Sequence, residues 1–267
     1  MRTWVVGSGT LLPHPRRGSP AHWVEVGQAR ILLDAGAGTL RTLARLERVW
    51  SGVSHLFLTH FHTDHVGEVA SLLFALKHGS REARSLPLHV LGPRGLRAFM
   101  ARLADAHGPF VLDPGFPVEI RELPPGDGWR DPGGDFDVST HPTHHSKGSL
   151  AFRIDALEGT VGYTGDTGPR EGLGTFLRGV GLLLAECSNP DAEAMETHLA
   201  PASLARLARE ARPELLVTVH GYPPLEPRNV PGLVEAAGYG GRVLPGEDGL
   251  CVIWDSKEVR VDSSRVV

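Results

Sequence analysis

A short histidine-rich segment constrains this chain more than any other feature. Residues 60–65 read His-Phe-His-Thr-Asp-His and follow directly on an apolar run that is typical of a β-strand. Neutral imidazole and carboxylate groups are ligands for zinc and similar divalent ions. In an extended segment, His60 and His62 point the same way and can share one ion. Asp64 and His65 come after the chain turns and suit a second ion, so the segment predicts a metal site at the end of a strand.

Length and composition indicate a compact protein with room for a buried core. The chain has 267 residues, of which 41% are hydrophobic and 22% charged, as is usual for globular proteins. No apolar run reaches membrane-spanning length, and Gly7-Ser8-Gly9 interrupts the first one too early for a secretory signal. Cys187 and Cys251 are too few for a disulfide framework. We therefore expect a cytoplasmic protein, and the net charge of −4 argues against a general nucleic-acid coat.

Short β-like runs alternate with helical patterns along the whole chain. Strands are expected near residues 4–6, 22–26, 30–34, 53–58, 88–91, 118–120, 136–141, 149–154, 159–163, 182–185, 215–219, 241–244 and 250–254. Helices are expected near residues 36–48, 66–78, 93–106, 202–211 and 231–237. Residues 108–134 are rich in proline and glycine and are expected to form loops around a single short strand.

The expected elements form two similar strand-rich halves, about 1–134 and 135–267, within one domain of residues 1–267. Two such halves, each with helices, suit two β-sheets packed face to face and covered outside by helices. We therefore predict an α/β protein whose fold is an αββα sandwich of two mixed β-sheets with helices on both outer faces.

Further candidate ligands stand where later strands begin or end. His145 precedes an expected strand, Asp166 follows one and His220 ends one. Each of them alone can be an ordinary turn residue. Together with the first segment they supply five histidines and two aspartates, which are enough to surround two metal ions with one shared carboxylate.

These motifs resemble those of the metallo-β-lactamase-fold hydrolases, and the resemblance runs over almost the whole chain. It is carried by residues 60–65, by Gly165-Asp166-Thr167 and by His220. The chain looks most like the ribonuclease Z and phosphodiesterase branch, on the basis of residues 7–10, 32–36 and 163–167 and the spacing from His145 to residues 152–154. The resemblance implies the metallo-β-lactamase fold with two divalent ions per chain, zinc or alternatively manganese or iron.

The resemblance also implies how the ligands divide between the ions. One ion would be held by His60, His62 and His145, the other by Asp64, His65 and His220, and Asp166 would bridge the two. Asp34 looks like a carboxylate that orients a ligand histidine and fixes its tautomer, although a cap before the glycine turn is an equally good interpretation. His144 competes with His145 for the ligand role, and the spacing to Phe152 favours His145.

His198 resembles a family histidine that is not a ligand but leans over the metals, with Glu186 as its orienting partner. Such a histidine can protonate an alkoxide leaving group or steady a phosphoryl oxygen. The alternative is a histidine in a surface loop. The candidate catalytic residues are therefore Asp64, His198 and Glu186.

The resemblance implies a dinuclear hydrolase, and in the first place a phosphodiesterase that attacks with a metal-bridging hydroxide. Ribonuclease Z enzymes grip tRNA with a projecting basic arm between the motifs represented here by His145 and Asp166. Only twenty residues separate these positions, so the arm is absent. Thr63 and Gly221-Tyr222-Pro223 also depart from that family's usual residues. These departures favour a small phosphodiester or short nucleotide as substrate over tRNA 3′ processing.

Three alternatives stay open from the sequence. The same centre can hydrolyse a carboxyl derivative such as a lactone, thioester or β-lactam, whereas a binding module without activity is disfavoured by the complete ligand set. tRNA remains an alternative substrate, because a homodimer can assemble a basic surface from an arginine-rich stretch of two chains. An ordinary solvated helix face is the simpler interpretation of that stretch, which contains Arg81, Arg84, Arg94, Arg97 and Arg102.

Overall fold

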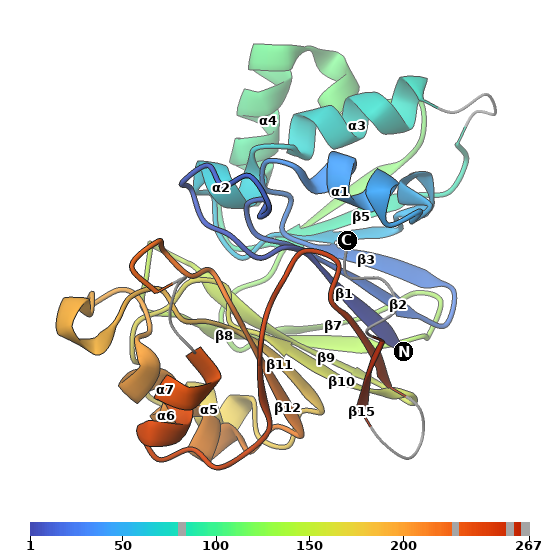
Figure 1. Cartoon of the computed structure of the whole chain (residues 1–267). Helices are drawn as coiled ribbons and strands as arrows, with labels where there is room; N and C mark the ends of the chain where they lie inside the picture. The colour runs from blue at the N-terminus through green and yellow to red at the C-terminus, as the bar shows by residue number, and fades with distance from the viewer. Residues whose placement is uncertain (80–83, 226–229, 255–258, 263–267) are drawn as a thin grey trace.

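The computed structural model describes residues 1–79, 84–225, 230–254 and 259–262. Two β-sheets pack face to face, and helices cover the outer side of each sheet (Figure 1). Within the described residues, one sheet has eight strands in the order β15-β14-β1-β2-β3-β4-β5-β6, and the other has seven in the order β13-β12-β11-β10-β9-β8-β7. The predicted αββα sandwich is confirmed.

The strands of the first sheet are β1 (Arg2–Gly7), β2 (Ala21–Val26), β3 (Ala29–Leu33), β4 (His55–Phe57), β5 (Leu88–Gly92), β6 (Val118–Glu122), β14 (Cys251–Trp254) and β15 (Val259–Asp262). Those of the second sheet are β7 (Gly128–Arg130), β8 (Asp137–Pro142), β9 (Leu150–Ala156), β10 (Gly159–Tyr163), β11 (Leu182–Glu186), β12 (Leu215–Val219) and β13 (Val243–Pro245). The C-terminal strands β14 and β15 thus return to the first sheet, beside β1.

Helices on the first sheet are α1 (Thr39–Arg45), α2 (Thr63–Val66), α3 (Val69–His78) and α4 (Leu96–His107), and those on the second are α5 (Leu173–Phe176), α6 (Pro201–Ala211) and α7 (Val230–Ala236). Single 3₁₀ turns are η1 (Trp50–Gly52), η2 (Pro109–Val111) and η3 (Asp191–Glu193). None of the described helices is long and apolar enough to span a bilayer.

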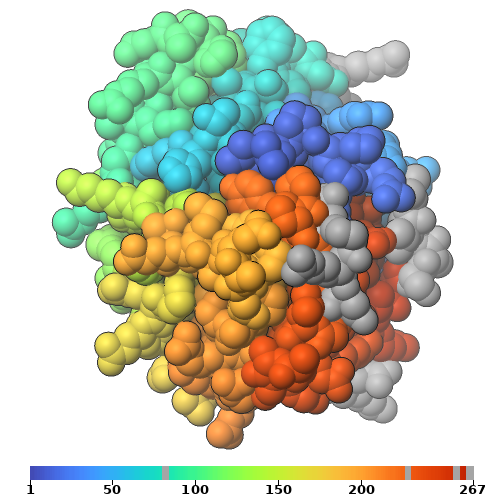
Figure 2. All heavy atoms as spheres, turned by 60° about the vertical axis from the view of Figure 1, so that its left-hand side comes forward, coloured from blue at the N-terminus to red at the C-terminus, as the bar shows by residue number. Residues whose placement is uncertain are grey.

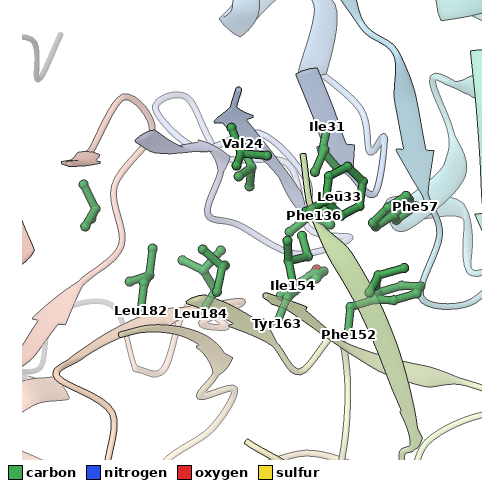
Figure 3. Packing of buried hydrophobic residues seen from close by; sticks show 14 of the residues in the cluster. Val24, Ile31, Leu33, Phe57, Phe136, Phe152, Ile154, Tyr163, Leu182 and Leu184 are labelled. Atoms are coloured by element: carbon green, nitrogen blue, oxygen red, sulfur yellow. The ribbon is translucent and has the colours of Figure 1, made fainter. Parts of the chain in front are cut away.

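The buried side chains form one apolar layer between the sheets and one beneath each set of helices. Alternate residues of a strand point to opposite faces, so Val5 faces the second sheet while its neighbours Trp4 and Val6 face the helices. Figure 3 shows Ile31 and Leu33 of the first sheet opposite side chains of the second. Because both faces of each sheet are covered, the sequences of the central strands are continuous apolar runs. Each fully buried aliphatic side chain stabilises the fold by about 1.5–3 kcal/mol.

One local expectation was wrong, and one helix begins later than expected. Residues 108–134 contain a second short strand, β7, which pairs with β8. The helix expected at 66–78 is α3, which begins at Val69; residue 66 ends the preceding short helix α2, and between them the backbone N–H of Glu68 donates to the carbonyl of Ala35 (2.8 Å). The Glu68 carboxylate instead accepts the N–H groups of Gly38 (2.7 Å) and Leu40 (2.8 Å) at the start of α1.

Candidate metal centre

The predicted ligands meet at one end of the sandwich. Strands β3 to β6 are parallel to one another, and so are β10 to β13. Parallel strands end at the same edge of a sheet, so the loops that follow them gather there. Segments from the two halves of the chain lie side by side on the face shown in Figure 2, where cyan, blue and orange residues meet.

The first group of candidate ligands is His60, His62 and His145, whose nitrogen atoms all lie within 4.8 Å of one another. His60 is buried in the segment that follows β4, and Nδ1 of His62 lies 2.9 Å from Nε2 of His145. His145 comes from the β8–β9 loop, where its Nδ1 lies 3.2 Å from the carbonyl oxygen of Thr197. This contact leaves Nε2 directed toward the other two histidines.

The second group of candidate ligands is Asp64, His65 and His220, whose donor atoms also lie within 4.8 Å of one another. His220 Nε2 is 3.5 Å and His65 Nε2 is 3.9 Å from Asp64 Oδ2. His220 follows β12 in a left-handed backbone conformation (φ 58°), which is uncommon for residues other than glycine. Its backbone N–H donates to the carbonyl of Ser8 (2.9 Å), a contact that holds this conformation in place.

Asp166 lies between the two groups. Its carboxylate oxygens are 3.2 Å from His65, 3.4 Å from His220, 3.6 Å from His145 and 3.9 Å from His60. A carboxylate that is close to imidazoles of both groups has the placement of a bridging ligand. The preceding Gly165 has φ 54°, and a Cβ there would approach Thr59 to 2.8 Å, so only glycine fits this close approach.

The donor set fits divalent metal ions. The Nε2 atoms of His60, His65 and His220 are buried and have no hydrogen-bond partner, although buried polar atoms normally have one. Burial and the nearby His65 lower the pKa of His60, which keeps its imidazole neutral. Burial opposes charging of Asp166 as well, but His220 and His65 outweigh it and hold the pKa of Asp166 well below its usual range. A neutral imidazole such as that of His60 and an ionised carboxylate such as that of Asp166 are ligands that zinc and similar ions bind.

Asp34 orients His65. It follows β3, is fully buried, and accepts a 2.7 Å hydrogen bond from His65 Nδ1, which leaves Nε2 for a metal. Thr59 donates to Asp34 through its backbone N–H (2.8 Å) and hydroxyl (2.9 Å), and the Tyr163 hydroxyl donates as well (2.9 Å). Of the two interpretations of Asp34, the structure therefore supports the orienting carboxylate. Asp166 and Asp34 together outweigh burial and raise the pKa of His65 well above its ordinary value.

His198 lies beside the ligands, paired with Glu186. Its Nδ1 is 3.0 Å and 3.1 Å from the two oxygens of the Glu186 carboxylate at the end of β11. The His198 ring lies parallel to that of His220, with centroids 5.6 Å apart, and edge-on to His145 at 4.8 Å. Burial disfavours its charged form, but Glu186 outweighs burial and raises the pKa of His198.

His144 lies apart from the ligand groups. Its backbone N–H donates to the Thr167 hydroxyl (3.1 Å) and its carbonyl accepts from Gly168 (2.8 Å). His141 Nδ1 lies 2.8 Å from the Pro142 carbonyl oxygen and its ring packs on Phe176. The structure thus groups His145, rather than its neighbour, with the other candidate ligands.

The sequence did not reveal several supporting residues. The Ser188 hydroxyl donates to Glu186 (2.5 Å) and also lies 3.3 Å from Nδ1 of both His198 and His220. Tyr222 stands edge-on to the same two histidines, at 6.1 Å and 5.8 Å between centroids. The position of Ser188, two residues beyond the candidate Glu186, was the available signal.

Comparisons with known proteins identify the family of this chain. Residues 29–221 match the family described as a beta-lactamase superfamily domain. Ribonuclease Z of Mycobacterium sp. (strain KMS) is 29% identical over 245 residues, which cover 84% of this chain and 85% of that protein. The structure of YhfI, a metallo-β-lactamase-fold protein from Bacillus subtilis, matches with a TM-score of 0.80 at 20% identity, over 94% of this chain and 98% of that one. The short form of human tRNase Z matches with a TM-score of 0.77 at 22% identity, over 95% and 99%.

The sequence motifs, the match over most of the chain and the arrangement of the two sheets all lead to one assignment. The chain belongs to the β-lactamase superfamily, in its ribonuclease Z and phosphodiesterase-like branch, and has the metallo-β-lactamase fold.

Proposed function

We propose that this metallo-β-lactamase-fold hydrolase is a dinuclear phosphodiesterase that acts on short nucleotide substrates. The observation that carries the proposal is the position of Asp166 between two groups of ligand atoms, with the His198–Glu186 pair beside them. Two ions that share one carboxylate suit the hydrolysis of a phosphodiester, because the charge on both the attacking and the leaving oxygen needs stabilisation. The match to ribonuclease Z relatives favours this linkage over a carboxyl ester or amide.

The residues divide the work as follows. His60, His62 and His145 would hold one divalent ion, Asp64, His65 and His220 the other, and Asp166 both. When bound, such a pair of ions supplies hydroxide near neutral pH and neutralises charge on the phosphoryl oxygens. Asp34 keeps His65 in the tautomer that leaves Nε2 free.

His198 supplies the proton for the leaving group. Its Nδ1–H is held by Glu186, so Nε2 is the atom that can donate a proton to the departing alkoxide. The Ser188 hydroxyl and the backbone N–H of Thr167 both donate to Glu186 at 2.5 Å, and these bonds fix the carboxylate. Protonated His198 is favoured by Glu186, which suits a general acid that works near neutral pH.

The first test is metal content. We expect gently purified protein to contain two transition-metal ions per chain, zinc in the first instance, and to rebind two after removal by a chelator. Elemental analysis before and after reconstitution measures this. Because metal binding displaces protons from histidine ligands, rebinding should weaken as the pH falls. Trace metal only, with no rebinding, would contradict the proposal.

The second test is substrate size. The interval between His145 and Asp166 is filled by the β9 and β10 hairpin, so the structure has no projecting arm there. Tight tRNA binding needs several cationic side chains near phosphates. We therefore expect kcat/KM at one fixed salt concentration to be higher for a short linear or cyclic phosphodiester than for precursor tRNA. Efficient cleavage at the 3′ end of the acceptor stem would overturn the preference, whereas activity only on a lactone, thioester or nitrocefin would overturn the phosphodiesterase.

The arginine-rich stretch offers a homodimer only part of its side chains for binding tRNA phosphates. Arg81 lies outside the described residues. Arg84 donates to the carbonyls of Leu86 and Ser51 and lies over the ring of Phe116, 4.9 Å from its centroid. Its guanidinium is therefore occupied within its own chain, and the exposed arginines of α4 and the turn before it remain.

A further inference from the structure

A cavity lies where the two sheets reach their edge strands, away from the candidate metal ligands. Its volume is about 410 Å³, within the range of about 300–1,000 Å³ that is usual for small-molecule sites. Among the described strands, β6 is the last of the first sheet and β7 the last of the second. The cavity is lined by residues of both strands, of β5 and of the first turn of α4: His89, Leu91, Arg97, Val118, Glu119, Ile120, Arg121 and Trp129.

The face of β6 that is turned toward the second sheet carries charged side chains, whereas β5 carries His89 and Leu91 there. Pairing in register places Glu119 beside His89 and Arg121 beside Leu91, on the same side of the sheet. Leu91 belongs to the layer between the two sheets. Glu119 and Arg121 therefore point into the space between the sheets, while Ile120 faces the helices.

An aromatic wall closes one side of this cavity. The Trp129 and His89 rings lie with centroids 5.5 Å apart. Behind His89, the buried His55 ring stacks on it at 4.9 Å with an angle of 18° between the planes. His55 Nδ1 lies 2.8 Å from the Ser54 hydroxyl, and its Nε2 lies 3.2 Å from the buried carboxylate of Asp131. These contacts of His55 fix the orientation of its ring, and its stacking fixes that of His89 in the wall.

Two guanidinium groups that line the cavity are available to bind a ligand. Within the part of the chain that the structure describes, the side chains of Arg97 and Arg121 form no hydrogen bond or ion pair. The one acid in the lining, Glu119, is engaged by His89 Nδ1 at 3.1 Å. Charges that point inward from an edge strand also discourage edge-to-edge association, but that role needs neither a cavity nor an aromatic wall.

We propose that this cavity binds a nucleotide, with the base against Trp129 and the phosphate on Arg97 and Arg121. Aromatic side chains stack on any base, and guanidinium groups pair with phosphate through two parallel hydrogen bonds. The nucleotide is either a free mononucleotide or part of a longer substrate cleaved at the metal centre; only the second source rests on the proposed function. Strand β6 is two strands from β4, about 10 Å across the sheet, and the candidate ligands lie beyond the end of β4, so only a substrate of several nucleotides can extend from the metal centre to this cavity.

Binding is tested with 5′-AMP and the metal-loaded protein. We expect AMP to quench the fluorescence of Trp129, seen as the difference between the wild-type protein and Trp129→Phe. The double variant Arg97→Ala/Arg121→Ala should bind AMP at least about tenfold more weakly, because charged hydrogen bonds to phosphate are lost. Arg102→Ala, an exposed change on the same helix outside the cavity, is the matched control and should bind as wild type. Equal AMP binding in the double variant and the wild type, or no quenching at millimolar AMP, overturns the site.

Turnover distinguishes the two sources of the nucleotide. If the substrate supplies it, the double variant should show a raised KM for a trinucleotide and unchanged kinetics on bis(p-nitrophenyl) phosphate. If a free nucleotide is the ligand, both substrates should behave as in wild type while AMP binding is lost. Absence of phosphodiesterase activity in the wild-type protein would refute the proposed function and leave the AMP measurement unaffected.

Discussion

Replacing His198 by alanine is expected to keep both metal ions and to lower turnover of a phosphodiester with an alkoxide leaving group by about 10²–10⁴-fold, the usual range for a positioned general acid. The reason is geometric: Nδ1 of His198 is held by Glu186, and only Nε2 can face a substrate. Metal content and kcat measured on the same preparation test this. Loss of an ion would make His198 a ligand, since its nitrogen also lies within 4.8 Å of donor atoms of His145 and Asp166.

The leaving group provides the control for this result. p-Nitrophenolate departs near neutral pH without a proton, so the loss caused by His198→Ala should be much smaller on bis(p-nitrophenyl) phosphate than on a diester that releases a sugar hydroxyl. An equal loss on both substrates would indicate that His198 acts by steadying a phosphoryl oxygen or by supporting the fold. Full activity on both would make it an ordinary loop histidine.

Glu186→Gln offers an independent readout through pH. A general acid must be protonated, so the rate falls as the pH rises through the pKa of His198. Glu186 raises that pKa, and removal of its charge should therefore move the alkaline limb of the pH–rate profile to lower pH. A limb that stays in place would contradict the assignment of His198 as the acid.

The main architecture was predictable because buried strands and amphipathic helices have recognisable hydrophobic patterns within a short stretch of sequence. The strand at 215–219 and the helix at 202–211 lie within one residue of their expected places, since each is long and strongly patterned. The elements that were missed are short. β7 is only three residues long and exists because it pairs with β8, and α5 spans four residues, which is too short to show a helical period.

The candidate ligands were recognisable for a different reason. Most of them are contiguous or directly follow a strand, so local spacing carries the signal. Their supports are joined only by the fold: Tyr163 and Asp34 meet although they are 129 positions apart. The nucleotide cavity has the same character, because Arg97, Arg121 and Trp129 approach one another only when the two sheets close. A local sequence pattern cannot predict such contacts between residues that are far apart in the chain.

Asp166→Asn is expected to impair both metal positions and to reduce turnover by about 10²–10⁴-fold at fixed metal concentration. The size follows from about 3–5 kcal/mol for breaking one side of a buried charge pair, at tenfold per 1.36 kcal/mol. Asparagine keeps the shape of the side chain but removes the charge that approaches imidazoles of both groups, at 3.2 Å from His65 and 3.6 Å from His145. Metal titration should show two weakened sites.

Asp64→Asn is the matched comparison, because Asp64 belongs to the second group alone, with His65 and His220. It should weaken one site and leave the ion held by His60, His62 and His145 at its original affinity. The two variants remove the same charge by the same chemistry, so a difference in the number of affected sites can come only from position. If Asp166→Asn also weakened a single site, Asp166 would be a ligand of one ion and the shared-carboxylate centre would have to be abandoned. Two weakened sites in Asp166→Asn and one in Asp64→Asn would establish Asp166 as the residue that joins the two halves of the site.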